Sequence, residues 1–203
     1  MQIRELSVPD AFEVVPVQHG DDRGVFLEWF ARDRFEKETG HRLQLAQANC
    51  SVSSRGVVRG IHFADVPPGQ AKYVSCAAGA VLDVVVDLRT DSPTYGSWEA
   101  VRLDDVERRA VFVAEGLGHA FMALSNQATL VYLCSEQYNP QREHGVDPFD
   151  SDLAIDWPGG ERALTSARDA AAPGLHELAT AGRLPTWDAC QAFYADGRSG
   201  QSD

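Results

Sequence analysis

A histidine and two cationic residues, Arg59, His62 and Lys72, lie within fourteen residues of the sequence. His62 carries an imidazole, which titrates near neutral pH and can therefore accept a proton. The guanidinium of Arg59 suits an anionic ligand, and the ammonium of Lys72 can stabilise negative charge that develops in a transition state. Together, the three residue types predict proton transfer on an anionic substrate.

The element around these residues must direct both Arg59 and His62 into one cavity. We predict a strand there, and in a regular strand two residues with this spacing point to opposite faces. Gly60 lies between them, and a glycine within a strand is a natural position for a β-bulge. We therefore expect a bulge at Gly60.

The alternation of apolar and polar residues predicts strands up to about residue 157. It is clearest over 80–88, where Asp83 and Asp87 share a face with Val81 and Val85. The other predicted strands are 25–30, 44–52, 57–63, 73–76, 110–113, 120–124 and 129–134. Many short strands at this spacing predict a mainly β fold, either a sandwich or a barrel.

Helical patterns are confined to two places. Residues 32–39 predict a short peripheral helix that ends at Gly40. Residues 175–182 and 186–194 predict a helical C-terminal tail, over about 174–203, which follows a barrel core over about 10–160. Residues 196–203 are rich in Gly, Ser and Asp, and we expect them to be frayed.

The composition narrows the class of protein. A chain of 203 residues fits one domain, here 1–203. Its net charge of −12 leaves no basic face of the kind that binds nucleic acid. No apolar run approaches the ~18 residues of a membrane helix, and the N-terminus has no apolar core of a secretory signal. We therefore expect a cytoplasmic protein without nucleic-acid or membrane partners.

The four cysteines are far apart in the sequence and form no C-x-x-C pair. This spacing does not favour a zinc site. We expect buried, reduced thiols at all four positions: Cys50, Cys76, Cys134 and Cys190.

Several short motifs follow one another along most of the chain. They include Asp21-Asp22-Arg23-Gly24, Gln47-x-Asn49-x-Ser51, Arg59-Gly60-Ile61-His62, Pro67-Pro68-Gly69-Gln70-Ala71-Lys72, Ser92-Pro93-Thr94-Tyr95-Gly96, Glu115-Gly116-Leu117-Gly118-His119, Tyr138-Asn139-Pro140 and Ser166-Ala167-Arg168-Asp169. In these motifs and their order, over roughly residues 10–173, the sequence resembles the RmlC-like epimerases, dTDP-4-dehydrorhamnose 3,5-epimerase and its relatives. The resemblance implies a cupin-like jelly-roll barrel that acts as a homodimer on a dTDP-linked 4-keto-6-deoxyhexose. It also implies that neither a metal nor a redox cofactor takes part.

The resemblance gives four residues catalytic roles. His62 would be the general base that removes a proton next to the keto group, and Asp169 would orient its ring. Lys72 would stabilise the enolate oxygen, and Tyr132 would return a proton from the other side of the sugar. By residue type alone, His62 and Tyr132 would be packed residues, and Lys72 and Asp169 would lie at the surface.

The resemblance also implies a substrate-binding set. Arg59 and Gln47 would contact the diphosphate, His119 would lie near the sugar and phosphates, and Asp83 would orient a cationic or histidine group inside the barrel. The nucleoside would be held by residues that in part come from the partner subunit: Arg23, Phe26, Glu28, Asn49 and Tyr138. Glu143 would lie close to the nucleotide.

Three alternatives remain at this point. A metal-binding cupin would need two histidines one residue apart, and no His-x-His follows His62. A sugar-nucleotide 3,4-ketoisomerase or a non-catalytic sugar-nucleotide-binding protein would share the fold. The motifs do not decide between epimerisation at C3, at C5 or at both. Phe63, the Ala71-Lys72-Tyr73 stretch and the long tail favour the natural-product branch, where epimerisation at C3 alone occurs.

Overall fold

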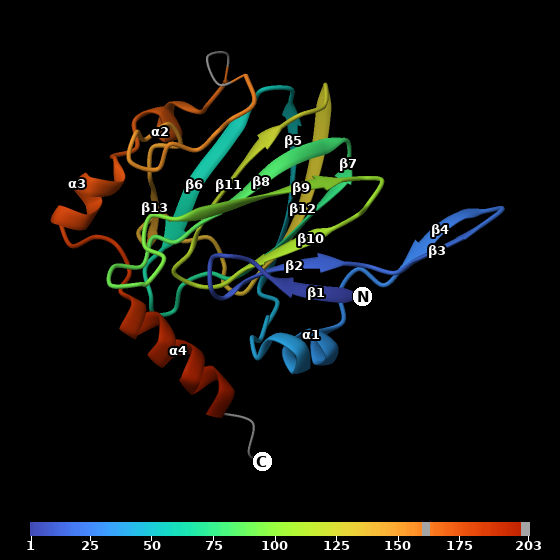
Figure 1. Ribbon diagram of the computed structural model, residues 1–203, viewed down its shortest axis with the longest axis horizontal. Helices are drawn as coiled ribbons and strands as arrows, with labels where there is room; N and C mark the ends of the chain where they lie inside the picture. Colours follow the sequence, from blue (N-terminus) through green and yellow to red (C-terminus); the bar gives the residue numbers. More distant parts are fainter. Residues whose placement is uncertain (160–162, 200–203) are drawn as a thin grey trace.

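The computed structural model describes residues 1–159 and 163–199. Two antiparallel sheets form the body of the molecule (Figure 1). The six-stranded sheet has the order β1 (Gln2–Glu5), β2 (Ala11–Val15), β10 (Ala110–Val113), β7 (Lys72–Ala78), β12 (Gln127–Cys134), β5 (Gln47–Ser54). The five-stranded sheet has the order β13 (Glu143–Gly145), β6 (Val58–Ala64), β11 (Gly118–Ala123), β8 (Ala80–Val86), β9 (Trp98–Asp104).

The predicted mainly β fold is confirmed, with antiparallel pairing throughout the two large sheets. The segment predicted as the strand 25–30 is instead one arm of a separate hairpin, formed by β3 (Gln18–Asp21) and β4 (Gly24–Leu27). This hairpin extends away from the body (Figure 1).

Helices lie at the periphery, as predicted. Helix α1 (Arg32–Thr39) ends at Gly40, whose positive φ of 74° closes the last turn through a bond from its N–H to the Glu36 carbonyl. Three more follow near the C-terminus: α2 (Ala167–Ala170), α3 (Leu175–Thr180) and α4 (Trp187–Ser199). None of the described helices is long and apolar enough to cross a membrane.

Strand β8 is buried on both of its faces, which explains its mixed sequence pattern. Val81 and Val85 belong to the core between the two sheets. Val84 and Val86 belong to a second core on the outer side of the five-stranded sheet. A carboxylate buried in such a strand needs a hydrogen-bonding partner, so Asp83 on β8, which is fully buried, points to a built polar site.

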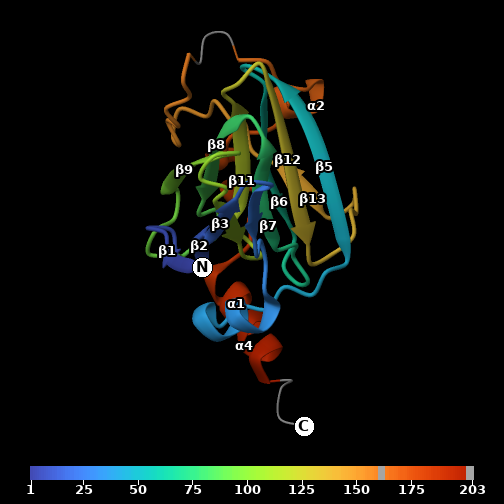
Figure 2. The same cartoon turned by 90° about the vertical axis from the view of Figure 1, so that its right-hand side faces the viewer.

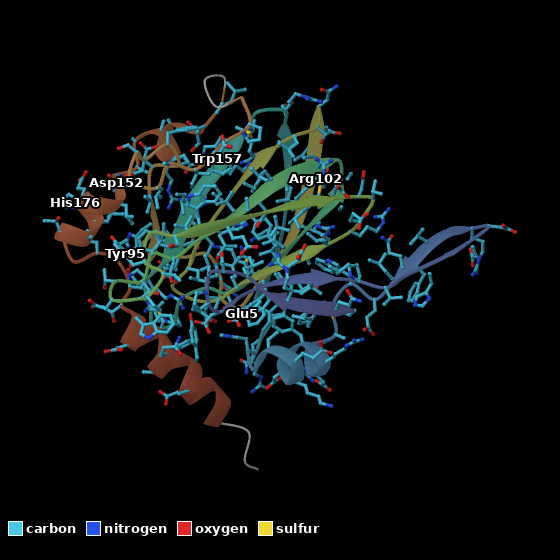
Figure 3. All side chains as sticks on the ribbon, viewed as in Figure 1. Glu5, Tyr95, Arg102, Asp152, Trp157 and His176 are labelled. Atoms are coloured by element: carbon cyan, nitrogen blue, oxygen red, sulfur yellow. The ribbon has the colours of Figure 1, made fainter. Side chains whose placement is uncertain are left out.

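The second core is covered by the C-terminal part of the chain. Trp157, Leu175, Leu178 and Leu184 pack there against the outer face of β6, β8 and β11. Figure 3 shows Trp157 on this side of the molecule, near α2 and α3. The tail therefore covers apolar surface of the barrel that would otherwise be exposed to water.

Helix α4 is attached through a fully buried arginine. Arg89 forms hydrogen bonds to both carboxylate oxygens of Asp87 at 2.9 Å and to Asp10 Oδ2 at 2.7 Å. The Trp187 ring stacks on its guanidinium, with 4.5 Å between Cζ and the ring centroid. Since α4 continues to Ser199, the predicted fraying is wrong for residues 196–199. Residues 200–203 lie outside the described residues.

All four cysteines are free thiols, but only three of them are buried. The prediction is wrong for Cys50, which is exposed. Among the described strands, β5 pairs only with β12 and forms one edge of its sheet. The side chains of β5 that point away from the core, including Cys50 and Val52, therefore face open solvent.

Candidate active site

The predicted bulge in β6 directs Arg59 and His62 to the same side. His62 pairs with His119 of β11, whereas Arg59 pairs with Phe121. Two residues of separation on β11 thus match three on β6, so β6 contains one extra residue. Gly60 lies within the bulge and has a φ of +118°. Residues with a side chain rarely adopt this value.

His62 and Asp169 form a hydrogen-bonded pair across a long sequence separation. His62 Nε2 lies 2.8 Å from Asp169 Oδ1, and the Gly60 N–H donates to Asp169 Oδ2 at 3.5 Å. Burial raises the pKa of the Asp169 carboxyl, but the hydrogen bond and charge of His62, together with the bonds from Gly60 and Ser166, outweigh burial and leave the pKa below its ordinary value. With Nε2 donating to this carboxylate, Nδ1 of His62 retains its lone pair and can accept a proton.

Lys72 and Tyr132 come from the other sheet. In the strand register Lys72 lies opposite Cys134, and Tyr132 lies opposite Asn49 on β5. Gln47 is the partner of Cys134 on β5. Because alternate residues of a strand share a face, the side chains of Gln47, Asn49, Tyr132 and Cys134 form a single polar row on this wall.

The environment of the two candidate catalytic groups changes their acidity. Desolvation lowers the pKa of the Lys72 ammonium, although Cys134 and Glu143 act in the opposite direction. Desolvation raises the pKa of the Tyr132 phenol, while nearby Arg59 lowers it. Tyr132 is therefore protonated near neutral pH, the state that a proton donor requires.

The two walls also meet through direct contacts. Arg59 on β6 donates from Nε to Ser53 Oγ on β5 at 3.1 Å. Gln70 donates to Glu143 Oε1 of β13 at 3.4 Å, and the Tyr138 N–H donates to Gln47 Oε1 at 2.9 Å. These contacts place the loop between β12 and β13 along the open side of the barrel.

A second histidine–carboxylate pair lies deeper in the barrel. His119 Nε2 is 2.8 Å from Asp83 Oδ2, and both side chains are buried. The other oxygen, Asp83 Oδ1, is buried and has no hydrogen-bond partner among the described residues. The Ser51 hydroxyl on β5 shares this property. Both are buried polar atoms whose hydrogen-bonding capacity is unused among the described residues.

A cleft of about 620 Å³ opens beside Asp169. Its lining includes Tyr138, Glu143, His144, Arg168, Asp169 and Arg183. Sequence reasoning missed Arg168, which donates to the Tyr138 hydroxyl at 3.3 Å and to the Glu143 carbonyl at 3.1 Å. The signal was available, since Arg168 directly precedes Asp169 in the last of the motifs.

Three of the predicted site residues are not brought to this site within one chain. Arg23, Phe26 and Glu28 lie on or next to the projecting hairpin, and all three are exposed. The hydrogen bonds of Arg23 go to Asp21 in the same hairpin. Side chains of the outer half of the hairpin stand clear of the body in Figure 3.

Comparison with known proteins identifies the family. The model of the dTDP-4-dehydrorhamnose 3,5-epimerase family matches residues 5–177. The chain belongs to this family. Its predicted jelly-roll fold and its assignment as an enzyme of the epimerase type are thereby confirmed.

Individual relatives of this epimerase are similar over almost their whole length. A dTDP-4-dehydrorhamnose 3,5-epimerase from Mycolicibacterium smegmatis is 56% identical over 95% of both chains. A dTDP-4-dehydrorhamnose 3-epimerase from Streptomyces niveus is 60% identical over 95% of this chain and 92% of its own. The crystal structure of a 3'-monoepimerase from Streptomyces bikiniensis, in complex with dTDP-quinovose, superposes with a TM-score of 0.93 at 48% identity, over 96% of this chain and 98% of that one.

Proposed function

We propose that this enzyme inverts C3 of a dTDP-linked 4-keto-6-deoxyhexose. The relatives are named either 3,5-epimerases or 3-epimerases, and both names include C3 as a site of epimerisation. The observation that carries the proposal is that His62, paired with Asp169 of α2, lies on the five-stranded sheet, while Tyr132 lies on the six-stranded sheet. Epimerisation needs a base on one face of a carbon and an acid on the other, and two facing sheets supply this arrangement.

The reaction begins at the proton on C3, which the neighbouring C4 keto group makes acidic. His62 Nδ1 accepts this proton, and the electron pair of the C–H bond moves into an enolate whose charge lies on the C4 oxygen. Asp169 stabilises the imidazolium that forms. Lys72 stabilises the oxyanion, a charge that exists only after the proton has left.

Protonation from the opposite side completes the inversion. The Tyr132 hydroxyl donates its proton to C3 and the keto group reforms. The imidazolium of His62 then releases its proton to solvent and the Tyr132 phenolate takes one up, so both groups return to their starting forms. Substrate and product have the same oxidation state, so the steps balance without a redox cofactor. No metal ion enters the scheme.

The remaining site residues bind the nucleotide part in this proposal. Arg59 and Gln47 contact the diphosphate, and His119 with Asp83 lies beside the sugar. Asn49, Tyr138 and Glu143 line the nucleoside end. The hydrogen bond from the Tyr138 N–H to Gln47 supports this order, because Tyr138 lines the cleft and so brings Gln47 of the polar row next to it.

We also propose a homodimer in which the hairpin reaches the site of the partner subunit. Arg23, Phe26 and Glu28 would then meet the nucleoside there. Two features support this assembly. The hairpin exposes Val25 and Phe26, the latter at 72%, and β5 has an unpaired edge that can accept another strand.

The cellular setting and domain organisation are further parts of the proposal. Four free cysteines suit the reducing cytoplasm. We expect the barrel and its tail to act as one domain, since the tail residues complete the second core.

Incubation of the substrate dTDP-4-keto-6-deoxyglucose with the enzyme in D₂O tests the reaction. We expect NMR to show deuterium at C3 together with inversion there. Deuterium at C5 as well would assign a 3,5-epimerase, and its absence a 3-epimerase. A product with its keto group at C3 would identify a 3,4-ketoisomerase instead. If the protein bound the substrate but no hydrogen exchange occurred at C3 or C5, it would be a sugar-nucleotide-binding protein without epimerase activity.

The substitution His62→Ala tests the base. Exchange at C3 should fall by at least about a hundredfold, the usual contribution of a general base. The affinity for dTDP should stay close to that of the wild type, because His62 is assigned to the sugar. Unchanged exchange would remove His62 from the mechanism.

A further inference from the structure

The tail contributes a cation to the cleft beside Asp169. Arg183 lines this cleft together with Arg168, and Arg183 comes from the stretch between α3 and α4. It is exposed, and its guanidinium lies near the ring of His144, with 3.4 Å between Nη2 and Nδ1. Three elements distant in the sequence thus meet at one opening: β13, α2 and the tail.

A short chain of hydrogen bonds holds Arg183 in place. His144 Nε2 lies 2.8 Å from Asp65 Oδ1. Since a guanidinium can only donate, Nδ1 of His144 must accept from Arg183, and Nε2 then donates to Asp65. The His144 ring also packs against Phe63 at 5.4 Å between centroids. The orientation of His144 is therefore set from two sides.

The charge of Arg183 is not neutralised by the protein. Among the described residues Arg59, Arg168 and Arg183 form hydrogen bonds to hydroxyl, carbonyl and imidazole groups, and none of the three forms an ion pair with a carboxylate. In contrast, Arg32 pairs with Asp33 at 3.0 Å. Since Arg168 and Arg183 line the same cleft, this cleft presents two unpaired guanidiniums to an anion, in a chain of net charge −12.

We propose that Arg183 is a further substrate-binding residue, which contacts a phosphate group of the nucleotide, and that His144 is its positioning residue. The proposal rests on the proposed function and adds the tail to that site. The cleft borders the catalytic pair, because Asp169, which bonds to His62, is one of its lining residues. A nucleoside diphosphate carries the charge that an unpaired guanidinium favours.

Titration with dTDP at several salt concentrations tests the contact. Arg183→Gln should weaken dTDP binding by about tenfold at low salt, and its dissociation constant should rise less steeply with salt than that of the wild type. Arg32→Gln removes the same charge on α1, outside the cleft, and should leave both quantities unchanged. Wild-type affinity in Arg183→Gln would overturn the proposal, as would weaker binding with an unchanged salt dependence.

Substitutions at His144 test its positioning role. A Gln side chain can accept from Arg183 and donate to Asp65, so His144→Gln should keep wild-type dTDP affinity. His144→Phe can do neither and should weaken binding as much as Arg183→Gln does. The double variant with Arg183→Gln and His144→Phe should be no weaker than either single one. Additive losses would contradict a shared role.

These measurements are independent of the reaction. A failure to exchange hydrogen at C3 in D₂O would overturn the epimerase proposal while leaving the dTDP titrations intact. Conversely, an Arg183→Gln variant with unchanged dTDP affinity would leave the roles of His62 and Tyr132 as proposed.

Discussion

The polarity of each hydrogen bond decides what the central histidine can do. Because Asp169 accepts from Nε2, His62 offers Nδ1 to a substrate. A neutral histidine beside a carboxylate is a suitable base, and its imidazolium form is stabilised by the same contact. Tyr132 is held in its protonated form by burial. The two groups are thus prepared for opposite tasks before any substrate binds.

Substitution of the proposed acid separates proton removal from inversion. In Tyr132→Phe we expect His62 still to remove the C3 proton, so deuterium from D₂O still enters the substrate at C3. Formation of the inverted product should slow by about a hundredfold or more, because no donor remains on the opposite face. NMR measures both quantities in one sample.

Tyr95→Phe is the matched control for this change. Tyr95 lies on the α3 side of the molecule (Figure 3), and loss of its hydroxyl should alter neither rate. If Tyr132→Phe inverted C3 at the wild-type rate, another donor would have to replace Tyr132 in the mechanism.

At the level of elements, the glycine of the bulge is what allows β6 to carry two site residues on one face. A Cβ at Gly60 would lie 2.6 Å from both Ala120 Cβ and the His119 carbonyl oxygen. Neither neighbour can yield easily, since both belong to the central strand β11. The bulge therefore tolerates no side chain.

Gly60→Ala should accordingly destabilise the protein more than an unfavourable φ alone. We expect a loss of about 2–5 kcal/mol in the free energy of unfolding, from the φ preference and the overpacking together. Gly24→Ala has a similar φ of +126° but nothing within 4 Å, so it should lose only about 1–3 kcal/mol. Chemical denaturation compares the two, and equal losses would show that the close contact is irrelevant.

Sequence patterns predicted those elements whose residues alternate strongly. Strand 110–113 and helix 32–39 coincide with β10 and α1. Strands β1, β3 and β13 were not predicted, because they are short, rich in polar residues and partly exposed. Strands β2 and β9 and helix α2 were not predicted either. Their formation depends on partners that are distant in the sequence.

The candidate site shows the same limit. Local patterns suggest Arg59, His62 and Lys72 as a chemical group, since they are close in sequence. The place of Asp169 beside His62 depends on a separation of 107 residues along the chain, which no local pattern encodes. Only the family resemblance indicated that contact. Arg183 belongs to the tail, beyond the motifs of the resemblance. Only the folded structure shows that it lies at the cleft.

On the scale of the whole molecule, the lower end of the barrel contains a buried acid that the reaction does not use. Burial raises the pKa of the Glu115 carboxyl to about 7. Its side chain accepts from Ser135 at 3.4 Å, and its backbone carbonyl accepts from the Tyr194 hydroxyl of α4. Figure 2 shows α4 beneath the barrel, close to α1. Glu115 thus lies where the tail is attached.

This acid makes the stability of the protein depend on pH. In the unfolded chain the pKa of Glu115 returns to its ordinary value of 4.5. The folded state therefore binds the proton more tightly, and its stability falls as the pH rises from about 4.5 to about 7. The loss amounts to at most about 3 kcal/mol.

Denaturation at pH 5 and pH 8 measures this dependence. Glu115→Gln should flatten the profile by comparison with the wild type. Glu177→Gln, which removes an exposed carboxylate on α3, should retain the wild-type slope. A Glu115→Gln profile that coincides with that of the wild type would show that Glu115 does not hold its proton in the folded state.

The projecting hairpin has a genetic consequence. If each site combines one subunit's barrel with the other's β3–β4 hairpin, two defective chains can repair each other. Chains with His62→Ala keep a sound hairpin, and chains with Phe26→Ala keep a sound barrel. Co-expressed in equal amounts, they should form mixed dimers that each hold one intact site, which restores about a quarter of the wild-type sites. Complementation of this kind is impossible for an enzyme whose sites lie within single chains, so an inactive mixture would mean that the hairpin serves no neighbour.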